Sequence, residues 1–159
     1  MAIRSVALAG MVSDTSLYNI DGACVVGGAT AIPVGTAVRV STLEPLIGGH
    51  KSVIATGIAA NAALGVVVRS SYETPNGTAE AKGAVNVLTA GRIWMRTTLA
   101  AAPNFGTAVL VNSDGVVTTD GVATGWTFAG GFISNTRTSD GKQNLSPDGA
   151  LVEVQVKQK

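Results

Sequence analysis

Hydrophobic and polar positions alternate along short stretches of the chain, most clearly at the C-terminus. In ALVEVQVK, residues 150–157, Val152, Val154 and Val156 share one face, whereas Glu153 and Gln155 fall on the other. A period of two is the pattern of a strand with one buried and one solvated face. Similar runs predict further strands at 23–27, 36–41, 52–58, 64–70, 84–89, 92–99, 107–112, 115–119 and 126–134.

Turn signals separate these runs. Five of the six Asp residues directly precede Gly, and Asn76-Gly77 adds another such pair. Asp-Gly and Asn-Gly favour the positive φ angles of tight turns, so most Asp residues are interpreted as turn formers. No amphipathic helix longer than two turns is indicated. We therefore predict an all-β fold, an antiparallel sandwich, jelly roll or barrel.

One phrase occurs twice, as PVGTAVRV at residues 33–40 and as NFGTAVLV at residues 104–111. In each copy a Gly, Gly35 or Gly106, follows a turn and begins a predicted strand. We interpret the phrase as a turn that leads into a strand. An internal duplication and a coincidence between two similar β-corners both remain open.

Charge and hydropathy narrow the set of partners. Charged residues make up 13% of the chain and the net charge is +1, so no broad basic surface favours nucleic acid, and we expect no nucleic-acid partner. Mean hydropathy is +0.35. The uncharged run at 52–68 contains Gly57, Asn61 and Gly65 and is at the lower length limit for a bilayer span, so we also expect no membrane association.

Residues with catalytic chemistry are few and scattered. His50 is the single histidine, Cys24 is the single cysteine and lies among apolar neighbours, and the four Glu residues are far apart in the sequence. Asp14, the one Asp not followed by Gly, is interpreted as a cap that binds backbone N–H groups. We expect no catalytic residues, no metal site and no cofactor, and hence no enzymatic activity.

One strand has an unusual polar face. In GRIWMRTT, alternation places Arg92, Trp94 and Arg96 on one face and Ile93 and Met95 on the other. Trp and Arg are the residues most enriched at binding hot spots, so this stripe is a candidate contact surface. The alternative is a cation–π ladder that only covers the sheet.

The order of these segments resembles a known family. The passage AGMVSDTSLYNIDGACVVGGATAIPVGTAVRV, residues 9–40, resembles the opening of the structural cement, or capsid decoration, proteins of tailed bacteriophages. The later passages AVNVLTAGRIWMRTT, NFGTAVLVNSDGVVTT and FAGGFISNTRTSDGKQNLSPDGALVEVQV follow that family's order of Gly-led strands and hairpins. The resemblance covers nearly the whole chain.

The resemblance implies a non-enzymatic protein of the virion. Such a protein sits on the outer surface of the mature icosahedral capsid as a homo-dimer or homo-trimer and clamps neighbouring major capsid proteins. It implies an N-terminal arm, residues 1–22, followed by a single β domain, residues 23–159. The segment from Met1 to Val12 is expected to become ordered on binding. Candidate capsid contacts are Arg4, Met11, Asp14, Arg92, Trp94 and Arg96.

Two other functions remain open. The first is a receptor- or carbohydrate-binding β domain of a phage tail or adhesin. Sugar sites commonly use exposed aromatic rings with polar neighbours, and Trp94, Trp126, Tyr18 and Tyr72 are the available large rings for that role. The second is an enzyme on a β scaffold, which the missing constellation of reactive side chains argues against.

Overall fold

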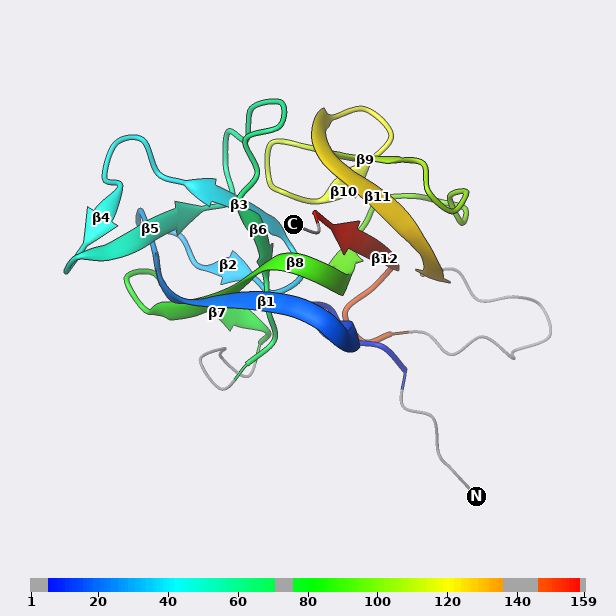
Figure 1. The fold of residues 1–159 in the computed structure, drawn as a ribbon, viewed down its shortest axis with the longest axis horizontal. Helices are drawn as coiled ribbons and strands as arrows, with labels where there is room; N and C mark the ends of the chain where they lie inside the picture. Colours follow the sequence, from blue (N-terminus) through cyan, green and yellow to red (C-terminus); the bar gives the residue numbers. More distant parts are fainter. Residues whose placement is uncertain (1–5, 71–75, 136–145, 158–159) are drawn as a thin grey trace, which may run out of the picture.

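The computed structural model describes residues 6–70, 76–135 and 146–157, and this part of the chain folds into strands without a helix (Figure 1). The expected all-β fold is confirmed. The strands are β1 (Val12–Val26), β2 (Ile32–Pro33), β3 (Ala37–Val40), β4 (Leu46–Ile47), β5 (His50–Ile54), β6 (Gly65–Val67), β7 (Thr78–Ala79), β8 (Ala84–Arg96), β9 (Ala108–Val111), β10 (Val117–Thr118), β11 (Val122–Ile133) and β12 (Leu151–Val156).

Five strands form a first ring. β1 pairs with β5, β5 with β3, β3 with β6 and β6 with β8, and β8 pairs in turn with β1. Only the β1–β5 pairing is parallel in this ring, and the other pairings are antiparallel. A sheet that closes in this way forms hydrogen bonds with the backbone N–H and C=O groups that an open sheet would leave unpaired at its edges.

A second ring begins on the same long strand. The C-terminal half of β8 pairs with β12, and β11, β9 and β10 follow in order, all antiparallel. A parallel bridge between Thr97 and Val117 then joins β10 to the residue after β8. In Figure 1, β9 to β12 lie on one side of the molecule and β2 to β5 on the other, with β8 running between them.

Strand β8 serves both rings because its inward face changes partway along. Val85 and Val87 point into the core of the first ring, whereas Ile93 and Met95 point into that of the second. In a regular strand, side chains an even number of positions apart lie on the same face. Because Val87 and Ile93 face different cores, the strand must twist or bulge between them. Gly91 lies in this interval with a φ of 119°, a conformation that glycine adopts readily. The predicted strands 84–89 and 92–99 are therefore largely one strand.

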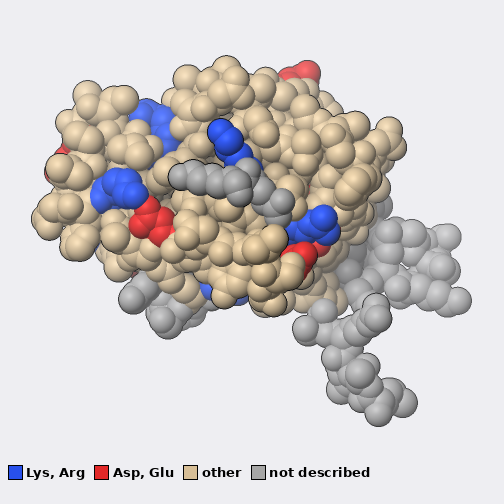
Figure 2. Space-filling model, viewed as in Figure 1, with Lys and Arg blue, Asp and Glu red and all other residues tan. Residues whose placement is uncertain are grey.

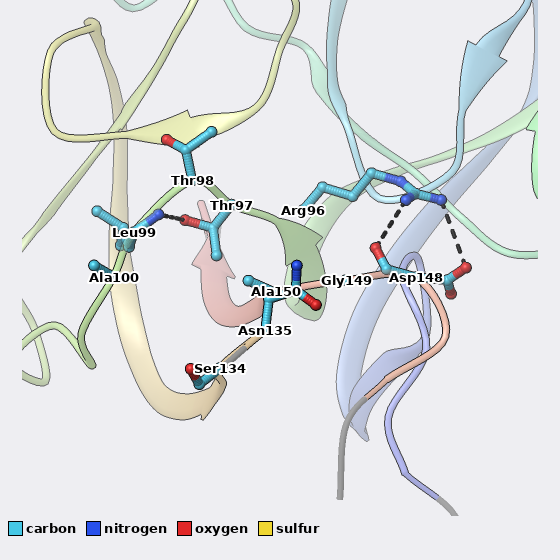
Figure 3. A pocket seen from close by; sticks show the side chains of 10 residues that line it. All are labelled: Arg96, Thr97, Thr98, Leu99, Ala100, Ser134, Asn135, Asp148, Gly149 and Ala150. Carbon is cyan, nitrogen blue, oxygen red and sulfur yellow. Dashed lines mark hydrogen bonds and ion pairs between the residues drawn. The ribbon is translucent and has the colours of Figure 1, made fainter. Parts of the chain in front are cut away.

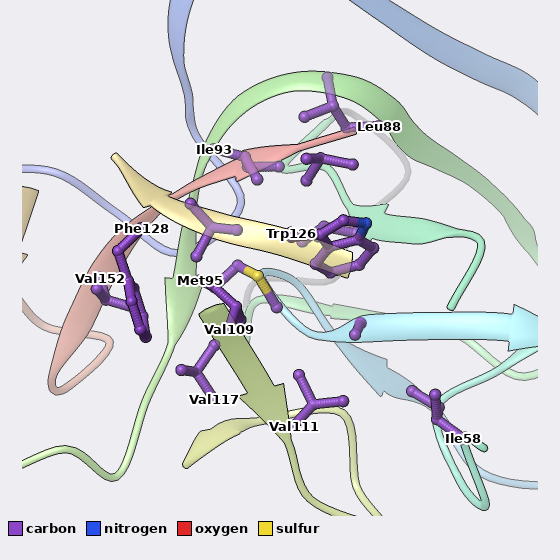
Figure 4. Close-up of a cluster of buried hydrophobic side chains, with 14 of the residues drawn as sticks. Ile58, Leu88, Ile93, Met95, Val109, Val111, Val117, Trp126, Phe128 and Val152 are labelled. Carbon is purple, nitrogen blue, oxygen red and sulfur yellow. The ribbon is translucent and has the colours of Figure 1, made fainter. Parts of the chain in front are cut away.

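The two rings have separate cores of small and branched side chains. The first core contains Ala9, Cys24, Val26, Ile32, Val34, Val38, Val53, Val67, Ala79, Val85, Val87 and Leu151. The second core contains larger groups, and Figure 4 shows Met95 reaching between Trp126 and Val109. A sulfur atom next to an aromatic ring is a favourable contact that fills irregular space.

The repeated phrase forms the same structure twice. Gly35 and Gly106 have φ angles of 78° and 79°. The next residue in each copy closes the turn through its hydroxyl group: Thr36 donates to the Pro33 carbonyl and Thr107 to the Asn104 carbonyl, both at 2.7 Å. The first copy leads into β3 and the second into β9. Each ring therefore contains one turn-into-strand unit, as the sequence predicts.

Strand β1 is longer than the sequence suggests. It begins at Val12 and pairs with β8 as far as Val25, so the boundary expected between residues 22 and 23 falls within it. The alternation rule missed this part because its side chains are exposed on both faces from Thr15 to Tyr18. Residues 1–5, the outer part of the expected arm, lie outside the described residues.

Candidate functional site

The predicted stripe on β8 has the expected orientation. Arg92, Trp94 and Arg96 are half-buried and alternate with fully buried Ile93 and Met95. Arg92 Nε donates a 2.9 Å hydrogen bond to Gln155 Oε1 of the neighbouring strand β12. The stripe therefore lies across the β8–β12 ladder, and each of its members already has partners within the chain.

Trp94 packs against the sheet. A Cβ atom placed on Gly131 would lie 2.4 Å from Trp94 Cη2, so the absence of a side chain at Gly131 makes room for the indole ring. The ring also borders the first core. Trp94 thus packs on the sheet and leaves only part of its surface to solvent.

Arg96 belongs to a partly buried charge cluster. Its guanidinium donates to the Val34 and Asp148 carbonyl oxygens at 2.9 and 3.0 Å, and Nη2 lies 3.7 Å from Asp148 Oδ1 (Figure 3). Arg69 Nη2 contacts Asp148 Oδ2 at 2.7 Å. Burial lowers the pKa of the Arg96 guanidinium. Asp148 thus compensates two arginines, beside a cavity of about 410 Å³ lined by the polar side chains of Thr97, Thr98, Ser134 and Asn135.

The same cluster fixes the N-terminal segment. Asp148 Oδ2 accepts the backbone N–H of Ala9 at 3.0 Å, and Arg69 Nε donates to the Ala9 carbonyl at 3.0 Å. Gly10 N–H donates to the Trp94 carbonyl at 2.8 Å, and Trp94 N–H donates to the Met11 carbonyl at 3.0 Å. Residues 9–11 are therefore attached to β8 and to the charge cluster.

The other predicted contacts lie near this anchor. Asp14 is the ladder partner of Arg92, and Met11 bonds to Trp94 of the same strand. The Asp14 carboxylate accepts hydrogen bonds from the Ser16 hydroxyl at 2.6 Å and the Ser16 N–H at 2.9 Å, which lower its pKa. The structure thus brings Met11, Asp14 and the stripe together, and Asp14 binds a backbone N–H as predicted. Arg4 lies outside the described residues.

A groove of about 890 Å³ lies where the two rings meet. On β8, pairing with β6 extends to Leu88 and pairing with β12 begins at Gly91, so Thr89 and Ala90 line the groove between those strands. Its remaining lining comes from β1, the segment before β6, β5 and the starts or ends of β11 and β12, namely Leu17, Tyr18, Asn19, Asp21, Lys51, Asn61, Ala63, Leu64, Thr124, Gly125, Trp126 and Lys157.

Large apolar side chains are exposed at three places. Leu17 and Tyr18 are 72% and 49% exposed beside the groove. Leu43 and Leu46 are exposed at β4, and Phe105 is exposed in the turn before β9. Sequence reasoning named Tyr18 only as a possible sugar-binding ring and missed the other four, because SDTSLYNIDG has no alternation and isolated apolar residues in loops carry no periodic signal. Asp148 was missed because its Gly neighbour marks it only as a turn residue.

Charged groups on the described surface are dispersed. Lys51 pairs with Asp21, which lowers the pKa of the Asp21 carboxyl, and Lys82 pairs with Glu44 at 2.6 Å. The face in Figure 2 is mostly uncharged, with blue and red atoms in small separate groups. The described residues contain no group of three or more His, Cys, Asp or Glu side chains arranged to hold a metal ion, and no helix among them is long and apolar enough to cross a membrane.

The Cys24 thiol, which lies among apolar neighbours in the sequence, is buried in the first core. Burial raises its pKa from 9.0 to about 11, so little thiolate is present at pH 8. We expect a thiol reagent at pH 8 to label the folded protein at least about 100-fold more slowly than the urea-unfolded chain. Equal labelling rates would contradict the buried position.

The raised pKa also predicts a pH dependence of stability. Between pH 9 and about 11 the unfolded chain releases the Cys24 proton while the folded chain retains it. The contribution of this thiol to stability is therefore complete below pH 9 and declines as the pH rises toward 11. Urea unfolding of the wild type should lose more stability over this interval than Cys24→Ala, and parallel pH curves for the two proteins would contradict the assignment.

An all-β fold with exposed apolar side chains and a groove between its two halves is typical of a protein that works through contacts with other macromolecules. Residues 2–157 match the sequence model of the family described as structural cement protein (E217 gp24/Pam3 gp6). The chain therefore belongs to this phage family. It is thus a structural protein of the phage virion that associates with capsid proteins, as the resemblance in the sequence implied.

A solved structure shows the same fold. A chain in the structure described as the capsid of Myoviridae phage XM1 superposes with a TM-score of 0.63 at 18% identity, over 99% of this chain and 95% of that chain. No curated protein shows significant similarity to this chain.

Proposed function

We propose that this protein decorates the outer surface of the mature icosahedral capsid and clamps neighbouring major capsid proteins together. Membership of the structural cement family supports this role most directly. It is a stabilising role carried by surfaces, without a chemical reaction.

The placement of exposed apolar groups supports the clamp. In Figure 1, β4 lies at one end of the long axis and the segment leading into β9 lies at the other. Leu43 and Leu46 are 98% and 60% exposed at the first of these ends, and Phe105 is 72% exposed at the second. A molecule with exposed apolar groups at both ends is able to touch two neighbours, as a clamp requires. This arrangement adds to the family membership, which is the observation that carries the proposal.

The low net charge fits a contact made mainly by shape and apolar groups. A stable contact buries more than about 1,000 Å² in total, and repetition over a symmetric shell allows weak individual contacts to suffice. We propose that the protein is a homo-dimer or homo-trimer on the capsid, which sedimentation analysis of the free protein and cross-linking on the head would test.

Co-sedimentation with capsids tests this function. Purified protein is mixed with undecorated, expanded heads of the parent phage and, as a control, with unexpanded shells. We expect saturable binding at a fixed ratio to the major capsid protein on expanded heads only. Absence of binding to expanded heads would contradict the proposal.

The predicted arm and stripe provide a test of where the contact lies. Deleting residues 1–5 removes Arg4 but keeps the hydrogen bonds of Ala9, Gly10 and Met11, and Arg92→Ala removes one bond on the β8–β12 face. We propose that both regions contact the capsid, and we expect each change to weaken binding to expanded heads several-fold. The deletion should leave the melting temperature unchanged, whereas Arg92→Ala should lower it by no more than about 5 °C, because it removes one hydrogen bond. Binding equal to that of the wild type would remove the altered region from the contact surface.

A further inference from the structure

We propose that the groove between the two rings of strands binds a neutral oligosaccharide. This inference goes beyond the proposed capsid role, because a clamp between capsid proteins needs no sugar site. It rests on polar groups that line the groove without a hydrogen-bond partner in the described part of the chain, beside an exposed aromatic side chain.

The first observation is the indole N–H group of Trp126. This side chain is 4% exposed, packs in the second core and lines the groove, and Figure 4 shows its nitrogen on the side away from Met95. The indole N–H has no acceptor among the described residues. The one enclosed side-chain polar atom left unpaired among those residues is Ser52 Oγ, so the indole N–H is open to solvent. A buried indole usually donates a hydrogen bond, and this donor is left for a ligand in the groove.

The second observation is the side chain of Asn61. Its φ of 57° lies in the left-handed region, and its backbone N–H donates to the Ala123 carbonyl at 2.7 Å, which holds the turn on β11. A Cβ atom on Gly125 would lie 3.5 Å from Asn61 Oδ1, so the amide lies over β11 next to Trp126. The amide makes no hydrogen bond to another described residue. It therefore offers a donor and an acceptor beside the indole N–H.

The third observation is Tyr18 on the β1 side of the groove. A Cβ atom on Gly91 would lie 2.8 Å from Tyr18 Cβ, so the backbone of Tyr18 is held against β8. The side chain is 49% exposed, and its hydroxyl has no partner in the part of the chain that the structure describes. Of the four aromatic side chains that the sequence offers for sugar binding, Tyr18 and Trp126 both line this groove. Tyr18 is the surface on which the apolar face of a sugar stacks.

The remaining polar groups favour a neutral ligand over an ionic one. Lys51 pairs with Asp21, and Asn19 Nδ2 donates to Thr89 Oγ1 at 2.6 Å, so these four side chains are bonded within the chain. Lys157 lines the groove and has no ion pair among the described residues. The unpaired groups are thus a phenol, an amide and an indole N–H, with one ammonium group. Sugar hydroxyls both donate and accept hydrogen bonds, and so match this mixture.

The size of the groove suits a short oligosaccharide. Its volume of about 890 Å³ lies within the range of about 300–1,000 Å³ that is typical of small-molecule sites. Ala63, Leu64 and Trp126 supply an apolar wall, and the unpaired polar groups come from separate segments of the chain. An apolar surface with a few converging polar groups is the usual composition of such a site.

Binding is tested with the wild-type protein on an array of neutral hexose and N-acetylhexosamine oligosaccharides, and the strongest binder is then titrated by calorimetry. Tyr18→Ala removes the stacking surface. Asn61→Gly removes the amide, and glycine adopts the φ of 57° without strain. We expect each variant to bind this oligosaccharide at least about tenfold more weakly. Both side chains are exposed, so the melting temperature should change little.

Phe105→Ala is the matched control because Phe105 is also an exposed aromatic residue but does not line the groove. This variant should bind the oligosaccharide like the wild type and bind expanded heads several-fold more weakly. Tyr18→Ala and Asn61→Gly should show the reverse behaviour. In an NMR titration of the wild type, the indole N–H signal of Trp126 should shift with added oligosaccharide, whereas that of Trp94 should not.

The outcomes separate this inference from the proposed function. A wild-type protein that binds expanded heads but no oligosaccharide on the array overturns the sugar site alone. Oligosaccharide binding without binding to heads supports the sugar site and overturns the capsid role. Equal sugar affinity of the wild type, Tyr18→Ala and Asn61→Gly overturns the placement in the groove. If Tyr18→Ala and Asn61→Gly instead lose binding to heads, the groove is a capsid contact and the sugar assignment is wrong.

Discussion

Gly65→Ala is expected to lower the free energy of unfolding by roughly 3 kcal/mol or more, because the new methyl group has no space. A Cβ atom at Gly65 would lie 2.1 Å from the Leu88 carbonyl oxygen and 2.8 Å from Val87 Cγ1. The first of these is a backbone atom of β8, so relief requires β6 and β8 to move apart. Since this pairing helps close the first ring, the damage should extend beyond one contact.

Gly22→Ala is the matched control within the same ring. Gly22 lies in β1 with an ordinary φ, and its nearest neighbour would be Asn86 Oδ1 at 3.4 Å, a side-chain atom. Alanine there should change stability by less than about 1 kcal/mol. Urea unfolding followed by circular dichroism measures both variants, and similar losses for the two would contradict the close approach of β6 to β8.

Asp148→Ala is expected to lower the free energy of unfolding by about 3 kcal/mol, because it removes a partly buried carboxylate that pairs with both Arg69 and Arg96. The three side chains are 16–24% exposed, so water replaces the lost partner only in part. The variant also removes the acceptor of the Ala9 N–H. Residues 9–11 should consequently exchange their amide hydrogens faster.

Glu44→Ala provides the comparison for an exposed pair. Glu44 and Lys82 are 52% and 51% exposed at a separation of 2.6 Å, so their pairing should contribute no more than about 1 kcal/mol. Thermal unfolding and hydrogen exchange distinguish the two variants. An Asp148→Ala protein as stable as Glu44→Ala would show that the cluster does not anchor the N-terminal segment.

The β architecture was predictable because alternation and Gly-containing turns are local signals. Val152, Val154 and Val156 are buried as their alternation indicates, and the two GTAV turns form where Gly35 and Gly106 predict them. The pairing of these strands into two rings was not predictable, since it depends on contacts between residues distant in the sequence. Near Gly91 the buried face of β8 changes sides, and in the sequence this change resembles a break between two strands.

The candidate site was predictable only where its residues follow the strand period. The stripe on β8 was found by alternation, but the bonds from Arg96 to Val34 and Asp148 span 62 and 52 residues and leave no sequence pattern. Leu17 and Tyr18 fall within the arm that the family resemblance implied, and their exposure on both faces of β1 leaves no alternation that would have indicated a strand. The pairing of β1 with β8 is moreover irregular between Asp14 and Asn19, and such a bulge leaves no regular pattern in the sequence.

The most direct test of the capsid role is a cryo-electron microscopy reconstruction of expanded heads saturated with this protein. The account predicts density for the two-ring fold on the outer surface of the shell, with each copy touching at least two neighbouring major capsid proteins. Density inside the shell, or copies that each touch a single capsid subunit, would contradict the proposed clamp.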